Sequence, residues 1–170
     1  MTENNYGGFS EESLRRIALR KVHFRMSVKI HVGVFITVNI LMLLLNLFFT
    51  PYFIWMIFPF FGWLIGVAEH ITAYLIYARG VYPTAKRGVI FHSIAYIFVM
   101  LYLFVLNILF TPFFYWALFP AVFWGAGLVI NAIAYFIYYR PSTDERGGVR
   151  SRTQRAVEKE IEKMKRRMNK

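Results

Sequence analysis

Four long segments of this chain are almost free of charged residues. They run over residues 30–49, 53–78, 88–110 and 113–139. Each is long enough for a helix that crosses the bilayer hydrocarbon core, which is roughly 30 Å thick. All 20 Lys and Arg lie outside these segments, and of the nine acidic residues only Glu69 lies inside one. The pattern predicts an all-α integral membrane protein with four transmembrane helices.

The apolar pattern is duplicated. Residues 31–79 align with residues 92–140 without a gap, and 19 of 49 positions are identical. The identities include Thr-Pro pairs, Phe-Pro pairs and Trp residues, which chance matches between apolar segments do not readily produce. The shared motif residues are Asn46, Pro51, Trp55, Pro59, Trp63 and Gly66 in the first copy and Asn107, Pro112, Trp116, Pro120, Trp124 and Gly127 in the second. We therefore predict two tandem helical hairpins, parallel repeats related by a pseudo-twofold axis along the membrane normal and packed as a four-helix bundle.

Basic residues gather on one side of the predicted membrane. The segment 1–29, the loop 79–87 and the tail from Arg140 onward hold all of them, whereas the turns near 49–53 and 110–113 hold none. The positive-inside rule then places both termini in the cytoplasm.

This gives four predicted parts. A basic, amphipathic N-terminal segment covers 1–29, and the first transmembrane hairpin covers 30–79. A loop with the second hairpin covers 80–140, and a linker with a basic helix covers 141–170.

The N-terminal segment is predicted to form a helix from Ser10, whose hydroxyl caps free N–H groups, with Glu11 and Glu12 in the positive first turn. Apolar residues follow at helical spacing, opposite the basic residues Arg15, Arg16, Arg20, Lys21 and Arg25. Two placements fit this pattern. The helix lies in the inner headgroup layer with its basic side chains on lipid phosphate, or it is a solvated extension of the first span.

The C-terminal part begins with residues 142–151, which read as a flexible linker. Residues 152–170 form a helix too polar to span the membrane. Its apolar residues make a narrow stripe of Val157, Ile161, Met164 and Met168. This stripe pairs with a partner helix or lies on the inner leaflet, and Lys163, Arg166 and Arg167 are the candidate contacts to lipid or partner.

The second and fourth spans have two possible beginnings. In one interpretation, the helix starts at Pro51 and is kinked at Pro59. In the other, residues 51–58 lie in the outer interface and the span begins at Pro59. The kinked continuous helix is favoured, because a neighbouring helix can cover the carbonyl that proline leaves free.

One acidic residue lies inside a predicted span, which often marks a functional site. This residue is Glu69, followed by His70. Asn39 on the first span and His70 on the second lie at similar depth, about 12 to 13 Å of helix from the basic side, so we expect a hydrogen bond between them. The second repeat has Met100 and Asn131 in their places, and Asn131 is expected near the pseudo-twofold axis, facing His70.

Two interpretations of the polar cluster Asn39, Glu69, His70 and Asn131 stay open. The side chains join the helices by hydrogen bonds worth about 1 kcal/mol each, or they form a site for a proton, an ion or a ligand. A metal site that includes His31 and His92 is disfavoured, because these lie about 12 Å closer to the basic side.

The remaining motif residues are expected to be structural. Asn46 and Asn107 precede the Thr-Pro turns and are expected to bond free carbonyls at the helix ends. Gly66 and Gly127 are expected to permit close helix approach. Trp55 belongs in the aromatic belt, and Trp63 and Trp124 are expected to pack.

The composition and the missing catalytic motifs exclude several classes of function. The absence of Cys excludes disulfides and thiol chemistry. The net charge of +11 flanks membrane spans, so it favours anionic lipid over nucleic acid as a partner. No catalytic triad, metalloprotease motif or phosphate-binding loop is present. The sequence therefore predicts no enzyme and no cofactor.

The first hairpin resembles the two-transmembrane (2TM) domain family of prokaryotic membrane proteins. The resemblance covers Arg20 to His70 and rests on Phe24, His31, Asn39, Asn46, Pro51, Trp55, Pro59, Gly62, Trp63, Gly66 and His70. The second hairpin departs from the pattern at Met100, Phe123 and Asn131. The family implies a membrane module found alone or attached to other domains, in the plasma membrane of a prokaryote, with no settled activity.

Two functions follow from the sequence. The favoured one is a non-enzymatic membrane scaffold, adaptor or assembly module that acts through its cytoplasmic basic helices, alone or as a homo-oligomer. The alternative is a small channel, transporter or membrane sensor that uses Asn39, Glu69 and His70.

Overall fold

The computed structural model describes residues 10–80, 84–143 and 148–168. Its elements in chain order are α1 Glu11–Phe49, α2 Ile57–Ala78, α3 Thr84–Phe110, α4 Leu118–Ala134, a π-helical turn Tyr135–Tyr139, β1 Ser142–Thr143, β2 Val149–Arg150 and α5 Arg152–Met168. The helices α1, α2, α3 and α4 (the last with its π-helical turn) are long and apolar enough to cross a membrane. The prediction of a four-span, all-α membrane protein built from two tandem hairpins is confirmed.

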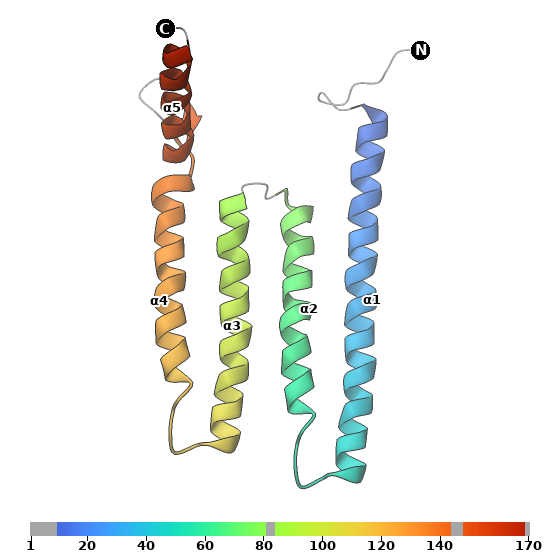
Figure 1. The fold of residues 1–170 in the computed structure, drawn as a ribbon. Coiled ribbons are helices and arrows are strands. Elements are labelled where there is room, and N and C mark those ends of the chain that lie inside the picture. The colour runs from blue at the N-terminus through green and yellow to red at the C-terminus, as the bar shows by residue number, and fades with distance from the viewer. Residues whose placement is uncertain (1–9, 81–83, 144–147, 169–170) are drawn as a thin grey trace.

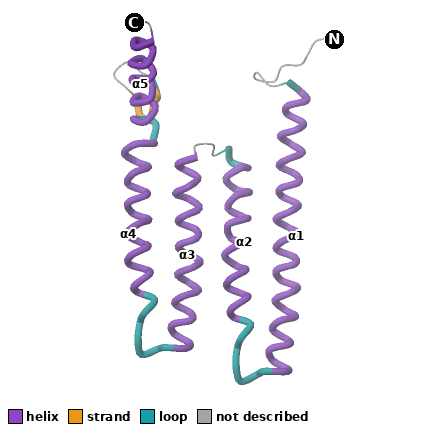
Figure 2. The backbone as a smooth tube through the Cα atoms, in the orientation of Figure 1, coloured by secondary structure: helices purple, strands orange, loops and turns teal. Residues whose placement is uncertain are grey.

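The four long helices stand side by side in chain order (Figure 1). Each packs antiparallel to the next, so that α2 and α3 occupy the middle and α1 and α4 form the flanks. The turns within the two hairpins lie at one end, and the end of α2 and the start of α3 lie at the other (Figure 2). We call these the turn end and the basic end.

The prediction of a closed four-helix bundle is wrong, because the helices form an open row. Lipid tails are as apolar as the flanks of α1 and α4, so no hydrophobic force drives these flanks together.

Helix α1 is a single element of 39 residues, which corresponds to about 58 Å of helix. It begins where the sequence predicts. The Ser10 hydroxyl accepts a hydrogen bond from the Ser13 amide at 3.3 Å, and Glu11 and Glu12 occupy the first turn. No break separates the basic N-terminal part from the span, so the structure matches the continuous extension rather than a separate helix.

The favoured interpretation of the second and fourth spans is wrong. Helix α2 begins at Ile57 and helix α4 at Leu118, each after a loop. Pro59 and Pro120 are consequently the third residues of their helices. A proline in the first turn removes an N–H that has no partner within the helix, so it costs no hydrogen bond there.

The two hairpins meet where α2 packs on α3, through stacked aromatic rings. Phe61 and Tyr102 stack at 5.6 Å with an interplanar angle of 8°. Closer to the turn end, Phe58 and Phe110 stack at 5.6 Å and 17°. Stacked rings add directional attraction to van der Waals packing, which is the main force between helices in lipid.

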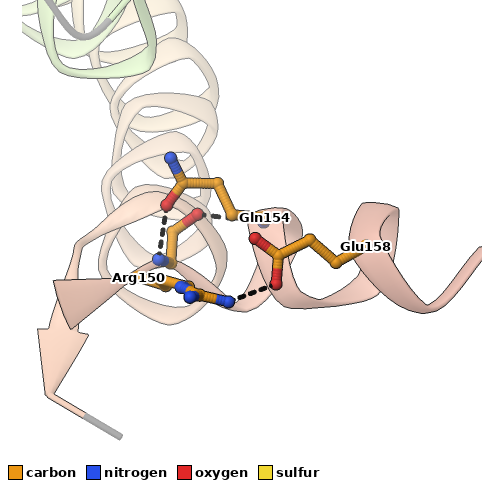
Figure 3. A network of polar contacts seen from close by, with 4 residues as sticks. Arg150, Gln154 and Glu158 are labelled. Carbon is orange, nitrogen blue, oxygen red and sulfur yellow. Dashed lines mark hydrogen bonds and ion pairs between the residues drawn. The ribbon is translucent and has the colours of Figure 1, made fainter. Parts of the chain in front are cut away.

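Part of the predicted linker over 142–151 forms regular structure, and residues 144–147 of it lie outside the described residues. Strands β1 and β2 pair antiparallel, with Ser142 opposite Arg150. Helix α5 then begins with a capping box, in which the Ser151 amide bonds the Gln154 side chain at 2.8 Å and the Gln154 amide bonds the Ser151 hydroxyl at 3.2 Å. Figure 3 shows this box beside the ion pair of Arg150 and Glu158. The capping box fixes the first turn of α5.

Candidate functional site

Each hairpin is closed by a hydrogen bond between Trp and His. Trp63 on α2 donates its indole N–H to Nε2 of His31 on α1 at 2.9 Å. Trp124 on α4 donates in the same way to Nε2 of His92 on α3. An indole nitrogen can only donate, so each His accepts through Nε2. In the neutral imidazole the proton then sits on Nδ1.

These two bonds were missed by the sequence reasoning, which treated Trp63 and Trp124 as packing residues. A signal was nevertheless present. In both repeats the Trp follows the His by 32 residues, and a duplicated polar pair at fixed spacing within apolar segments indicates a shared contact.

The turn of the first hairpin is organised by Asn46, near the end of α1, whose side chain is only 2% exposed. Its amide nitrogen donates to the carbonyls of Thr50 and Phe53, both at 2.8 Å. Its oxygen accepts from the Met56 amide at 3.0 Å, immediately before α2. One side chain thus bonds three backbone groups that lie outside the helices.

The turn of the second hairpin has the same arrangement. Asn107 donates to the carbonyls of Thr111 and Phe114 and accepts from the Ala117 amide. In both turns the Trp of the motif adds a further bond. Trp55 and Trp116 donate to the hydroxyls of Thr50 and Thr111, each at 2.7 Å. The Asn, Thr and Trp of the repeated motif therefore build the loop.

The predicted hydrogen bond between Asn39 and His70 is wrong. The His70 Nε2 lies 3.3 Å from the Ser27 hydroxyl, and the Asn39 amide donates to the Phe35 carbonyl of its own helix at 2.7 Å. Ser27 and Asn39 are twelve residues apart on α1, or about 18 Å along its axis.

The error came from the assumed edge of the membrane segment. The prediction measured depth on the first span from His31, whereas α1 continues unbroken past that residue to Glu11. Side-chain packing sets the register instead, with Phe35 against Phe60 at 5.5 Å and His31 beside His70 at 5.3 Å between ring centroids.

Glu69 points away from this contact, toward the other side of α2. Its carboxyl lies against the α3 backbone at Ala95, and one carboxyl oxygen is buried with no hydrogen-bond partner among the described residues. The buried Asn39 side-chain oxygen also lacks a partner there. Two unpaired acceptors therefore lie in different helix interfaces rather than in one cluster. Within the ranges that the structure describes, no three His or acidic side chains gather as a metal site requires.

Asn131 does not face His70 as predicted. It lies exposed on α4, and α3 stands between α4 and α2 (Figure 1). Its counterpart position in the first repeat is occupied by His70, which reaches its own hairpin partner α1. The open row accounts for the difference. In a closed bundle α2 and α4 would face each other across a central axis, whereas in the row α3 separates them.

The expected role of Gly66 and Gly127 is also wrong. A Cβ atom at either position meets nothing within 4 Å among the described residues. The close approach lies at Gly125, where a Cβ atom would be 3.0 Å from the Tyr96 hydroxyl. Tyr96 on α3 donates this hydroxyl to the Ala121 carbonyl on α4 at 2.9 Å. Gly125 thus makes room for the Tyr96 ring.

Helix α5 is attached to the end of the last span. The Thr153 hydroxyl donates to the Tyr138 carbonyl at 3.0 Å, and the Arg155 guanidinium donates to the Ser142 hydroxyl at 2.9 Å. The apolar stripe Val157, Ile161, Met164 and Met168 stays exposed. The predicted lipid or partner contacts Arg15, Arg16, Arg20, Lys21, Arg25, Lys163, Arg166 and Arg167 are exposed as well.

A comparison with protein-family models matches the 2TM domain twice, over residues 16–79 and residues 84–163. The two matches correspond to the two hairpins and together cover most of the chain. The chain belongs to the 2TM domain family. Comparisons with curated proteins and with solved structures give no match.

The family boundaries add to the sequence prediction. The first 2TM domain includes much of the basic part of α1, and the second extends through most of α5. Both polar ends therefore belong to their 2TM domains. The second 2TM domain keeps the Asn-Thr-Trp turn and the Trp–His bond, although it lacks counterparts of Asn39 and His70.

Proposed function

We propose that this protein is a non-enzymatic membrane scaffold that presents α5 to a partner protein on the cytoplasmic side. The observation that carries the proposal is the attachment of α5 to the last span while its apolar stripe stays exposed. A helix fixed at one end holds its exposed face at a defined height above the membrane. This arrangement reduces the entropy that a partner must remove on binding.

The charges beside the stripe favour a helix as the partner. Val157 and Met164 occupy one apolar position of a heptad repeat, and Ile161 and Met168 occupy the other. The positions that flank this apolar stripe hold Glu158, Glu160, Lys165 and Arg167. These carry both signs of charge, as the flanks of paired helices do. A helix that lies on anionic lipid would carry basic residues on both flanks. The stripe spans about two heptads, so it pairs with a partner rather than forming a stable coiled coil alone.

Site-specific photo-crosslinking in living cells tests the proposal. A photoreactive residue at Ile161 is expected to give a discrete protein adduct, whereas one at Glu162, one position along and turned by about 100°, gives none. Deletion of 152–170 should remove the partner from the purified complex. Equal labelling at both positions, or labelling of lipid alone at Ile161, would refute the scaffold.

The buried, unpaired Glu69 oxygen favours a second candidate function, which is transport or sensing of a proton or cation. A carboxyl within a membrane span is costly and often marks an ion pathway. Flux of H⁺, K⁺ and Na⁺ into proteoliposomes distinguishes the two functions. Flux that is lost in Glu69→Gln or His70→Ala supports the pathway and contradicts the scaffold. Absence of flux in the unmodified protein removes the second candidate.

A further inference from the structure

We infer that copies of this chain associate head to tail in the membrane, with α1 of one copy packed on α4 of the next as α3 packs on α2 within a chain. The inference deepens the proposed assembly role and rests on it for its biological meaning. It uses a different surface from α5, so the two can fail separately.

The internal repeat carries the argument. The 61-residue spacing relates α2 to α4 and α3 to α1. A single chain makes the contact between hairpins once, between α2 and α3. The corresponding faces of α4 and α1 stand at opposite flanks of the row (Figure 1), so each chain has one unused copy of each half of its own interface.

The α4 half is exposed where its α2 counterpart is covered. Ile57 on α2 is 9% exposed, whereas the corresponding Leu118 on α4 is 50% exposed. Phe58 is 37% exposed and its counterpart Phe119 is 57% exposed, and the half-buried Phe61 corresponds to Val122, which is 64% exposed. The α4 face that corresponds to the α3-facing side of α2 therefore has no neighbouring helix within the described part of the chain.

The α1 half of the proposed interface has an aromatic residue that corresponds to Phe110. Phe110 on α3 contacts Phe53 and Phe58, with ring centroids at 6.1 Å and 5.6 Å. Its counterpart on α1 is Phe49, which is 77% exposed. The counterparts of Phe53 and Phe58 are Phe114 and Phe119, which line an apolar groove at the turn end of α4.

Phe49 of a second copy therefore fits this groove as Phe110 fits its own. In the internal interface and in the proposed one, the contact at this position joins aromatic side chains from both helices. Close packing of such side chains joins helices in lipid.

The interface within a chain, between α2 and α3, contains the Glu69 carboxyl, whereas the proposed interface between copies has no carboxyl at the corresponding position. Glu69 and Ala95 correspond to Ile130 and Val34, which are both exposed and apolar. Joining two copies thus buries no carboxyl group at this position. Because the two faces differ, the contact is heterologous, and it generates a ring where the rotation between copies closes and a continuing row where it does not.

Cysteine cross-linking tests the inference, and the natural chain has no Cys to interfere. Full-length Phe49→Cys and Phe119→Cys proteins are mixed in proteoliposomes and treated with a short bis-maleimide. A covalent dimer is expected in the mixture and not in either variant alone. The double variant Phe58→Cys with Phe110→Cys should cross-link within one chain, which establishes that the reagent reaches across such a contact.

Phe48→Cys mixed with Phe119→Cys is the matched control, because Phe48 is 78% exposed and lies one residue from Phe49. It should give at most one tenth of the dimer. Equal yield from both mixtures would mean random collision, and dimers of Phe49→Cys alone would mean a symmetric contact. Either result, or no dimer while the intrachain control reacts, overturns the inference. Loss of the α5 photo-adduct with this cross-link intact would overturn the proposed function only.

Discussion

His31 accepts the indole N–H of Trp63 across the first hairpin at 2.9 Å, and the second hairpin repeats the bond between His92 and Trp124. We expect His31→Ala to leave the Trp63 N–H without its acceptor and to cost about 1 kcal/mol of stability. His31→Gln, which keeps an acceptor, should restore part of that loss. The direct measurement is the indole ¹⁵N–¹H spectrum, where His31→Ala should shift one of the four Trp signals. His23→Ala is the control, because His23 is exposed on the same helix. An unshifted Trp63 signal would contradict the bond.

Asn46→Ala should open the first turn, because it removes a hydrogen bond from each of two carbonyls and from one amide. The expected cost is about 2 to 3 kcal/mol, measured by denaturant unfolding in detergent micelles, with faster amide exchange confined to residues 50–56. Asn107→Ala should have an equal effect on the second turn, and the two costs should add because the turns are separate. Asn131→Ala, at an exposed position, should change stability by less than about 0.5 kcal/mol. A similar loss in all three variants would mean that the turn bonds do not matter.

Gly125→Ala should destabilise the second hairpin, whereas Gly127→Ala should not. The added methyl at 125 would lie 3.0 Å from the Tyr96 hydroxyl, and the one at 127 meets nothing within 4 Å in the described chain. Displacing Tyr96 from the Ala121 carbonyl should cost about 1 kcal/mol, seen as a lower thermal midpoint. In a Tyr96→Phe background this penalty should disappear. A penalty that persists there would assign it to the helix backbone instead.

Ser151→Ala should loosen the start of α5, because it removes one half of the capping box. Loss of a cap costs about 1 kcal/mol, so amide exchange in the first turn of α5 should rise about fivefold. Glu158→Gln makes an instructive comparison. Its ion pair with Arg150 is short, at 2.6 Å, but both side chains are about half exposed, and such pairs contribute little. Equal effects of the two changes would mean that the ion pair holds this end as strongly as the cap does.

The sequence was sufficient for the features that depend on local composition. The lengths of the segments without charged residues predict the four spans, and the 61-residue repeat predicts the two hairpins. Ser10 predicts the start of α1. Each of these can be identified along the chain without knowing which helices pack together.

The relations between helices were harder to predict. The pairing of Asn39 with His70 failed because the register of α1 against α2 is set by ring packing such as Phe35 on Phe60, which apolar residues alone do not specify. The closed bundle failed because apolar flanks need no protein cover in lipid. Glycine spacing was equally uninformative, since Gly125 and not Gly127 faces a neighbour.

The unbroken α1 also has a mechanical consequence. About 58 Å of helix is nearly twice the thickness of the hydrocarbon core, so close to half of α1 stands outside it. A helix with no hinge behaves as a lever. A sideways pull on its basic end is therefore delivered as a tilt at Phe49, directly beside the loop that Asn46 holds. Motion imposed by a partner on one side of the membrane thus reaches the opposite side through α1 itself, together with a shift of α1 against α2, on which it packs.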